Sequence, residues 1–219
     1  MLSGSWARYA PLSGVLFVAL VVASIIIGGE TPETDDATAR VVAEWARDDT
    51  EEIWSAVLGA LAAVPFIWFL GSLRSTLRAG EGGTGRLSTI AFGGGLIIAA
   101  GAGVNASLQF AIAQSVGEVP ANVTQTLSVL YSEFFLIFPI GFAPLFLATA
   151  LVILRTRVLP GWLGWFALVL GVLSLAGPVG FIAFLVGMIW ILAASIIMFQ
   201  QGEAAPPAAG QTALPTTSA

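Results

Sequence analysis

Six long apolar runs alternate with short polar segments along this chain. The runs cover residues 11–27, 53–73, 87–106, 134–154, 161–176 and 179–199. A helix needs roughly 20 apolar residues to cross the roughly 30 Å of hydrocarbon in a bilayer. Helices also satisfy their own backbone hydrogen bonds, which lipid cannot do. The pattern therefore predicts an all-α fold, a polytopic membrane bundle of six transmembrane helices over residues 1–200.

The polar segment between the first two runs has a helical period of its own. Ala37, Val41 and Trp45 recur at steps of four, and acidic residues occupy the other faces. This spacing predicts a short amphipathic helix at about 35–48, outside the membrane. Two roles stay open for it. It either lies on the end of the bundle, or forms an acidic cap that attracts a partner or cations.

Arginine indicates which side of the membrane each end of the bundle faces. If the six runs alternate in direction, six of the eight basic residues fall on one side. Cytoplasmic loops carry an excess of Lys and Arg, so both termini are predicted to be cytoplasmic in a plasma-membrane protein. Residues 201–219 are rich in Pro and Ala and poor in bulky apolar residues, which predicts a disordered cytoplasmic tail. The six arginines are Arg8, Arg74, Arg78, Arg86, Arg155 and Arg157.

The composition of the chain excludes several classes of functional site. The chain is 57% hydrophobic and 10% charged, outside the range of soluble globular domains, and it contains no Cys, His or Lys. Disulfides, His or Cys metal sites, histidine-ligated haem and a retinal Schiff base are excluded, as are Ser–His and Cys–His nucleophile pairs. We expect no cofactor, no metal and no enzyme activity. The Ala, Gly and Val bias, with Arg as the only strong base, suggests a GC-rich bacterial genome.

Two further segments carry weaker signals. The loop at 74–86 is glycine-rich and basic, as a phosphate cradle is, but it has no Lys and no P-loop pattern, which favours a flexible connection. In the third run, Gly95, Ala99 and Gly103 form a stripe of small residues at steps of four. Such a stripe lets another helix approach closely, so we expect this helix at the centre of the bundle, or at a homodimer interface.

Two amides stand out at the end of the third run and just beyond it, because they interrupt an apolar segment one helical turn apart. Counting from Arg86, Asn105 lies roughly 28 Å and Gln109 roughly 34 Å along the helix, at 1.5 Å per residue. Counting from Arg155, Glu133 lies roughly 33 Å along the fourth helix. All three are therefore expected at one height, near the external surface of the membrane.

This shared height supports a hypothesis and a simpler alternative. The hypothesis is an external polar vestibule formed by Asn105, Gln109, Tyr131 and Glu133 beneath the amphipathic helix. The alternative is hydrogen bonding that only fixes the third and fourth helices together, worth about 0.6 kcal/mol per contact.

One segment resembles a known pattern. In RTRVLPGWLGW, residues 155–165, the residues that carry the likeness are Pro160, Trp162, Leu163, Gly164 and Trp165. The segment is similar to one in a family of uncharacterised actinobacterial membrane proteins with about six helices, a domain of unknown function. The resemblance implies a plasma-membrane location and transfers no catalytic residue. Locally, the proline suits a helix start and the tryptophans suit the membrane interface.

Function is the least specified property. A non-catalytic accessory or scaffold protein needs only a packing stripe and an interaction surface, and we favour it. The alternative is a small-solute or ion permease with its external vestibule around Glu133. An enzyme is disfavoured because no nucleophile and base pair or metal cluster is visible. The expected partners are the lipid bilayer and either another membrane protein or a second copy of the chain; the acidic outer segment argues against nucleic acid.

Overall fold

The computed structural model describes most of the chain, and all its regular structure in that part is helical. The described residues are 9–28, 32, 36–47, 49–176 and 180–202. The expected tail at 201–219 lies outside them beyond residue 202. In order, the elements are η1 (Ala10–Leu12), α2 (Ser13–Gly28), α3 (Thr38–Arg47), α4 (Asp49–Glu81), α5 (Arg86–Ser115), α6 (Ala121–Glu133), η2 (Phe134–Leu136), α7 (Ile137–Thr156), α8 (Gly161–Leu173) and α9 (Gly180–Gln201).

Five helical segments of the described chain are long and apolar enough to cross a membrane. This identifies a multi-pass membrane protein built as a helical bundle. The run at 161–176 forms the shorter helix α8, whose 13 residues rise roughly 20 Å. The five long segments are Ala10–Gly28, Thr50–Glu81, Arg86–Ser115, Ala121–Thr156 and Ala183–Gln201.

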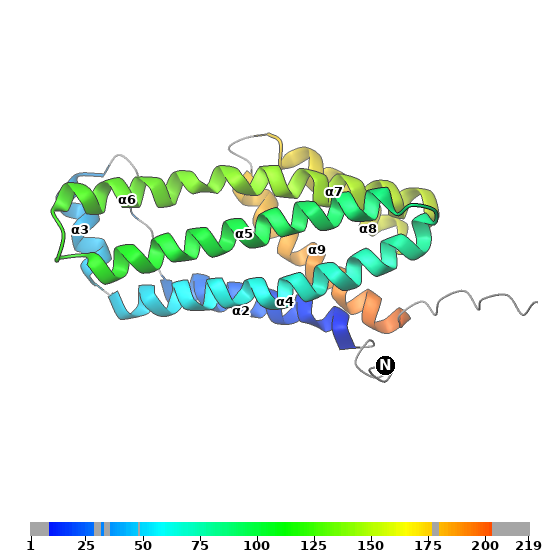
Figure 1. Cartoon of the computed structure of the whole chain (residues 1–219), viewed down its shortest axis with the longest axis horizontal. Helices are drawn as coiled ribbons and strands as arrows, with labels where there is room; N and C mark the ends of the chain where they lie inside the picture. Colours follow the sequence, from blue (N-terminus) through cyan, green and yellow to red (C-terminus); the bar gives the residue numbers. More distant parts are fainter. Residues whose placement is uncertain (1–8, 29–31, 33–35, 48, 177–179, 203–219) are drawn as a thin grey trace, which may run out of the picture.

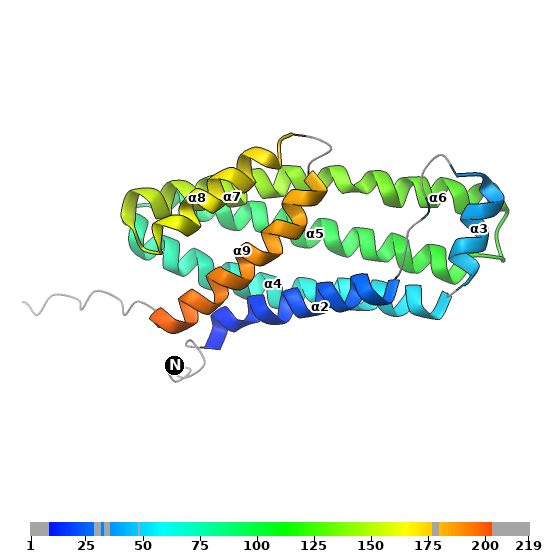
Figure 2. The same ribbon diagram turned by 180° about the vertical axis from the view of Figure 1, so that it is seen from behind.

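Helices α2, α4 and α5 and the run of α6 and α7 lie along one axis, and the short helix α3 lies across one end of them (Figure 1). Seen from behind, α8 follows α7, and α9 crosses obliquely from the side of α7 to the start of α2 (Figure 2). The rings of Tyr9 and Phe199 lie 5.8 Å apart, so the described chain begins and ends at the same end of the bundle. Arg86 and Arg155 lie at that end too, at the start of α5 and in the last turn of α7.

Helix α5 packs between α4 and α7 because glycines let the backbones approach. A Cβ built on Gly94 would lie 2.6 Å from the carbonyl oxygen of Gly141 in α7, and one on Gly95 would meet Leu70 of α4. The small-residue stripe is only partly covered: Ala99 is buried, whereas a Cβ on Gly103 would have no atom within 4 Å among the described residues. Helix α5 thus packs against α7 at Gly94 and against α4 at Gly95.

The fourth apolar run is part of a longer rod, because α6, η2 and α7 continue one another from Ala121 to Thr156. The run was predicted at 134–154 only. Helix α6 buries Thr124 and Ser128 against its neighbours, and such polar residues do not register as an apolar run. The 3₁₀ turn η2 just precedes Pro139, which has no N–H to complete the α-helical bond to the carbonyl of Phe135.

The loop between α4 and α5 is a glycine turn and not a phosphate cradle. Gly82, Gly83 and Gly85 all have positive φ, a conformation that glycine adopts without strain. The carboxylate of Glu81 accepts hydrogen bonds from the backbone N–H groups of Leu87 at 2.8 Å and Ser88 at 2.9 Å. It therefore occupies the N–H groups at the start of α5 that an incoming phosphate would need.

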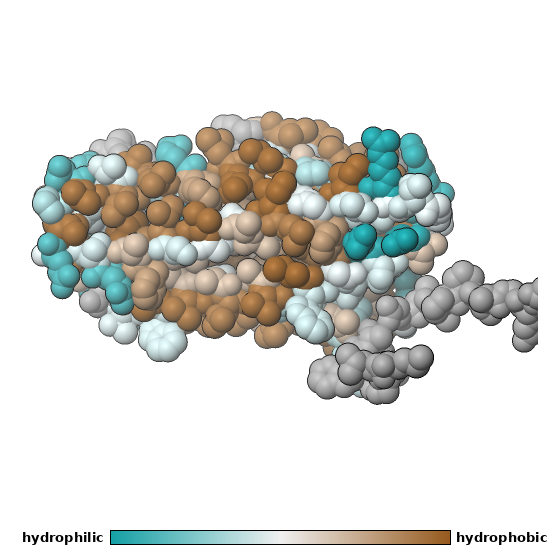
Figure 3. Space-filling view, viewed as in Figure 1, coloured by the Kyte–Doolittle hydropathy of each residue, from teal (hydrophilic) through white to brown (hydrophobic). Residues whose placement is uncertain are grey.

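The surface is apolar along the middle of the bundle and hydrophilic at its two ends (Figure 3). Ile26 is 75% exposed and Trp68 is 65% exposed. A water-soluble monomer rarely exposes apolar patches this large, whereas lipid-facing helices do. Trp190 is buried and donates its indole N–H to the carbonyl of Leu163 at 2.9 Å.

Candidate functional site

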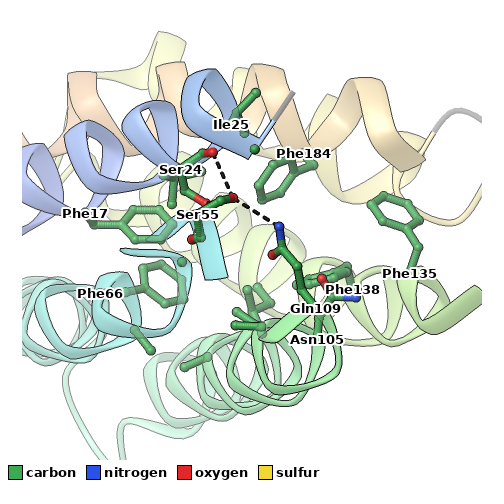
Figure 4. Close-up of a pocket in the computed structure, with 18 of the residues that line it drawn as sticks. Phe17, Ser24, Ile25, Ser55, Phe66, Asn105, Gln109, Phe135, Phe138 and Phe184 are labelled. Atoms are coloured by element: carbon green, nitrogen blue, oxygen red, sulfur yellow. Dashed lines mark hydrogen bonds between the residues drawn. The ribbon is translucent and has the colours of Figure 1, made fainter. Parts of the chain in front are cut away.

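A cavity of about 500 Å³ lies between α2, α4, α5, α9 and the rod that α6 and α7 form. This volume lies within the range of small-molecule sites in proteins. Figure 4 shows side chains from these helices pointing into it. The described side chains of its lining carry no charge. One end of the cavity is polar and the other is aromatic.

The polar end is a hydrogen-bonded chain across three helices (Figure 4). Nε2 of Gln109 donates to Oε2 of Glu52 at 2.7 Å and to Oγ of Ser55 at 3.1 Å. Because a carboxylate only accepts, this partner fixes which atom of the amide is the nitrogen. Ser55 and Ser24 each donate from Oγ to the other's carbonyl oxygen at 2.9 Å. The chain joins α5 to α4 and α4 to α2.

Asn105 lies one turn along α5 from Gln109, in the same wall of the cavity. Its Nδ2 donates to the backbone carbonyl of Tyr131 in α6 at 3.1 Å. This contact joins the third and fourth predicted helices, as the structural alternative proposed. Within the described part of the chain, no group donates a hydrogen bond to Oδ1 of Asn105 or to Oε1 of Gln109.

The aromatic end lies nearer to the arginine-bearing end of the bundle. The rings of Phe17 and Phe66 stack with centroids 4.5 Å apart, and those of Phe138 and Phe184 lie 6.1 Å apart. Ile98 of α5 adds an aliphatic wall. Between Ile98 and the polar end, α5 rises roughly 16 Å at 1.5 Å per residue. The cavity is therefore elongated along the bundle and amphipathic.

The cavity opens sideways between α2 and α9. Ile25 of α2 and Leu185 of α9 both line it, yet they are 48% and 38% exposed, so the rim reaches the apolar surface. The two helices meet at the other end of α2, where Gly14 packs directly against Ser195, and diverge from there (Figure 2). In a membrane, this opening faces lipid.

Helix α3 covers the end of the bundle above the polar residues. Trp45 is buried and donates its indole N–H to Oγ of Ser128 at 3.1 Å. Its ring packs edge-on against Tyr131 at 5.7 Å, and Tyr131 itself lines the cavity. Thr38 adds a hydrogen bond to Gln125 of α6. A molecule approaching along the bundle axis meets this helix first.

The structure brings together three of the four residues expected in a polar vestibule. Asn105, Gln109 and Tyr131 line one cavity, whereas Glu133 is exposed and is not part of the described lining. Successive helical residues are turned by about 100°, so Glu133 lies about 200° round the helix from Tyr131 and points away. The acid beside the amides is Glu52.

Sequence reasoning missed Glu52, Ser55 and Ser24. A signal for the first two was present, because residues three apart share one face of a helix, and that face of α4 carries both polar side chains. No group of three Asp or Glu side chains within the described ranges could hold a metal ion. The lining offers an apolar surface and hydrogen-bonding groups to a ligand.

Comparison of the chain with protein-family models, with curated proteins and with solved structures finds no match. The resemblance of residues 155–165 to an actinobacterial membrane family stays a prediction.

Proposed function

We propose that this protein is a non-catalytic membrane protein that binds an amphipathic, lipid-like molecule in the cavity between α2 and α9. One observation carries the proposal: a single cavity has a hydrogen-bonding end at Gln109, an aromatic end at Phe66 and Phe138, and a rim on the lipid-facing surface. The bilayer supplies the molecule, and binding needs no second protein. An accessory role, in which the bound molecule is held or presented, fits this chemistry.

The proposal includes a topology of six crossings with both termini in the cytoplasm of a bacterial cell. The ring of Phe184, near the start of α9, lies 6.1 Å from the rings of Phe138 and Phe142 in the first turns of α7. The start of α9 is therefore at the same height as the start of α7. From Phe138 to Thr156, α7 rises roughly 27 Å. The start of α9 then falls close to the far side of a hydrocarbon layer of roughly 30 Å, so the chain crosses the layer between the end of α7 and the start of α9. The arginines at the other end support a cytoplasmic assignment.

In this topology the cavity lies in the outer leaflet. Counting from Arg86, Ile98 lies roughly 18 Å and Gln109 roughly 34 Å along α5. The aromatic end then lies in the outer half of the hydrocarbon layer and the polar end at its outer boundary. A lipid of the outer leaflet has the same order, with its chain inward and its head outward.

Ligand binding is supported over permeation by what lies on either side of the cavity. A permease needs a polar path that continues across the membrane. Towards the arginine end, the bundle is filled by a packed apolar core that includes Phe69, Leu73 and Phe146, each at most 1% exposed. Towards the other end, α3 covers the axis. The lateral opening is the route that the geometry favours.

A steric block tests the proposal. Ala102 lines the cavity, whereas Ala100, two residues away on α5, is exposed and is not part of the lining. Wild-type protein in nanodiscs should be photolabelled by a tetradecanol that carries a diazirine in its chain, on peptides of α2, α5 and α9. Ala102→Trp should reduce this labelling at least fivefold, and Ala100→Trp should not. Equal labelling of all three proteins, or labelling spread over the outer surface, would refute the proposal.

A further inference from the structure

The polar end of the cavity has hydrogen-bond acceptors left over. Both protons of the Gln109 amide are used, because Nε2 donates to Glu52 and to Ser55. Its oxygen Oε1 accepts no hydrogen bond from the described residues, and the same is true of Oδ1 of Asn105. A carbonyl oxygen can accept two hydrogen bonds, so each of these atoms has capacity for a partner.

The donors nearby are mostly committed inside the protein. The hydroxyls of Ser24 and Ser55 donate to each other's backbone carbonyls at 2.9 Å. The hydroxyl of Ser132, which also lines the cavity, donates to the carbonyl of Ser128 at 3.1 Å. A bound molecule therefore finds oxygens that accept and few groups that donate. A head group that only accepts hydrogen bonds would leave these oxygens unsatisfied, which costs free energy in a site removed from water.

The charge around the polar end of the cavity also disfavours a head group that only accepts hydrogen bonds, if that group is anionic. The carboxylate of Glu52 lies 2.7 Å from Nε2 of Gln109, which lines the cavity, and the lining includes no arginine within the described residues. The arginines of α4, α5 and α7 lie at the far end of the bundle. An anionic head would lie near the carboxylate of Glu52, and no arginine of the described chain lines the cavity to bind it. A neutral or cationic head meets no such penalty.

We propose that the bound amphiphile has a head group that donates hydrogen bonds, an alcohol or a primary ammonium, and that Gln109 and Asn105 accept them through their side-chain oxygens. Phosphate and carboxylate heads should bind more weakly. This assignment rests on the binding function proposed above and narrows it to a class of ligand. It also explains the two amides in an apolar segment: their nitrogens join helices, and their oxygens receive the ligand.

Competition between amphiphiles with one chain and different heads tests the assignment. The diazirine-bearing tetradecanol serves as the label, and 1-tetradecanol, tetradecylamine and tetradecyl phosphate compete with it in nanodiscs of uncharged lipid. The alcohol, the amine or both should halve the labelling at a concentration at least tenfold below that of the phosphate. The better of these two competitors identifies whether a hydroxyl or an ammonium is the preferred donor.

Two variants test whether the side-chain oxygen of Gln109 causes the preference between head groups. Gln109→Met keeps the length of the side chain and removes its oxygen, and it should reduce the difference between alcohol and phosphate to less than threefold. Gln114→Met makes the same substitution at an exposed position of α5 and should keep the wild-type ranking. The wild-type ranking is decisive even if Gln109→Met does not fold.

The outcomes separate this assignment from the binding function. Equal competition by all three heads, or preference for the phosphate, overturns the head-group assignment and leaves ligand binding intact. Absence of cavity labelling in the wild-type protein overturns both.

Discussion

The contact between α5 and α7 is made by backbone atoms, and a single methyl group should separate the two helices. A Cβ on Gly94 would lie 2.6 Å from the carbonyl oxygen of Gly141 and 2.6 Å from the backbone nitrogen of Leu145. Side chains can rotate away from a new methyl, but helical backbone cannot. Gly94→Ala therefore requires α5 and α7 to move apart.

The magnitude follows from the size of the overlap. The two contacts are about 0.8 Å shorter than an ordinary contact of 3.4 Å. Overpacking of this kind costs about 1–3 kcal/mol, and replacing a helical glycine by alanine returns about 0.5–1 kcal/mol. We expect Gly94→Ala to lower the free energy of unfolding by about 1–2 kcal/mol, which corresponds to a fall of about 4 °C in Tm.

The neighbouring glycine is a matched control. A Cβ on Gly93 has no atom within 4 Å among the described residues, so Gly93→Ala keeps the gain in helix propensity without the overlap. Its Tm should equal or exceed that of the wild type. Thermal unfolding of the three purified proteins in one detergent, followed by tryptophan fluorescence, measures the difference. If Gly94→Ala is as stable as Gly93→Ala, α5 and α7 do not meet at Gly94.

Two further predictions concern the cap and the topology. Trp45→Phe removes the hydrogen bond to Ser128 but keeps a ring against Tyr131, so it should weaken the docking of α3 by about 1 kcal/mol, seen as faster hydrogen exchange in α3 with α9 unchanged. In this cysteine-free chain, Asn122→Cys should react with a membrane-impermeant thiol reagent on intact cells, and Thr84→Cys should react only after lysis; the reverse pattern would invert the proposed orientation.

The apolar runs were enough to predict most of the bundle, because lipid requires long apolar helices. They fail to predict a helix where the buried side chains are polar. Helix α6 buries Thr124 and Ser128 beneath α3, so its helical character does not appear as hydropathy. They also predict too long a helix for α8, which ends at Leu173 after 13 residues and is not one of the five long segments. Hydropathy predicts which segments are apolar, and packing decides how long each helix is.

The height of the candidate site was predictable, and its partners were not. Counting residues from the arginines places Asn105 and Gln109 at one level, because helical rise is nearly constant. The helix that Gln109 contacts depends on how α4 and α5 cross, and its partner Glu52 is 57 residues away in sequence. The same reasoning gives the height of Glu133 but not the direction in which it points, which depends on the rotation of α6.

The aromatic lining favours an apolar occupant over water at this end of the cavity. An unfilled apolar void in a packed core costs about 24 cal/mol per Å³, so an aromatic end left empty would be destabilising. Buried water needs two to four polar partners, and the rings of Phe66, Phe138 and Phe184 offer none. In the proposed function, an apolar chain from the bilayer fills this end without leaving any polar group unsatisfied. Its head must then lie where the lining turns polar, beside Asn105 and Gln109.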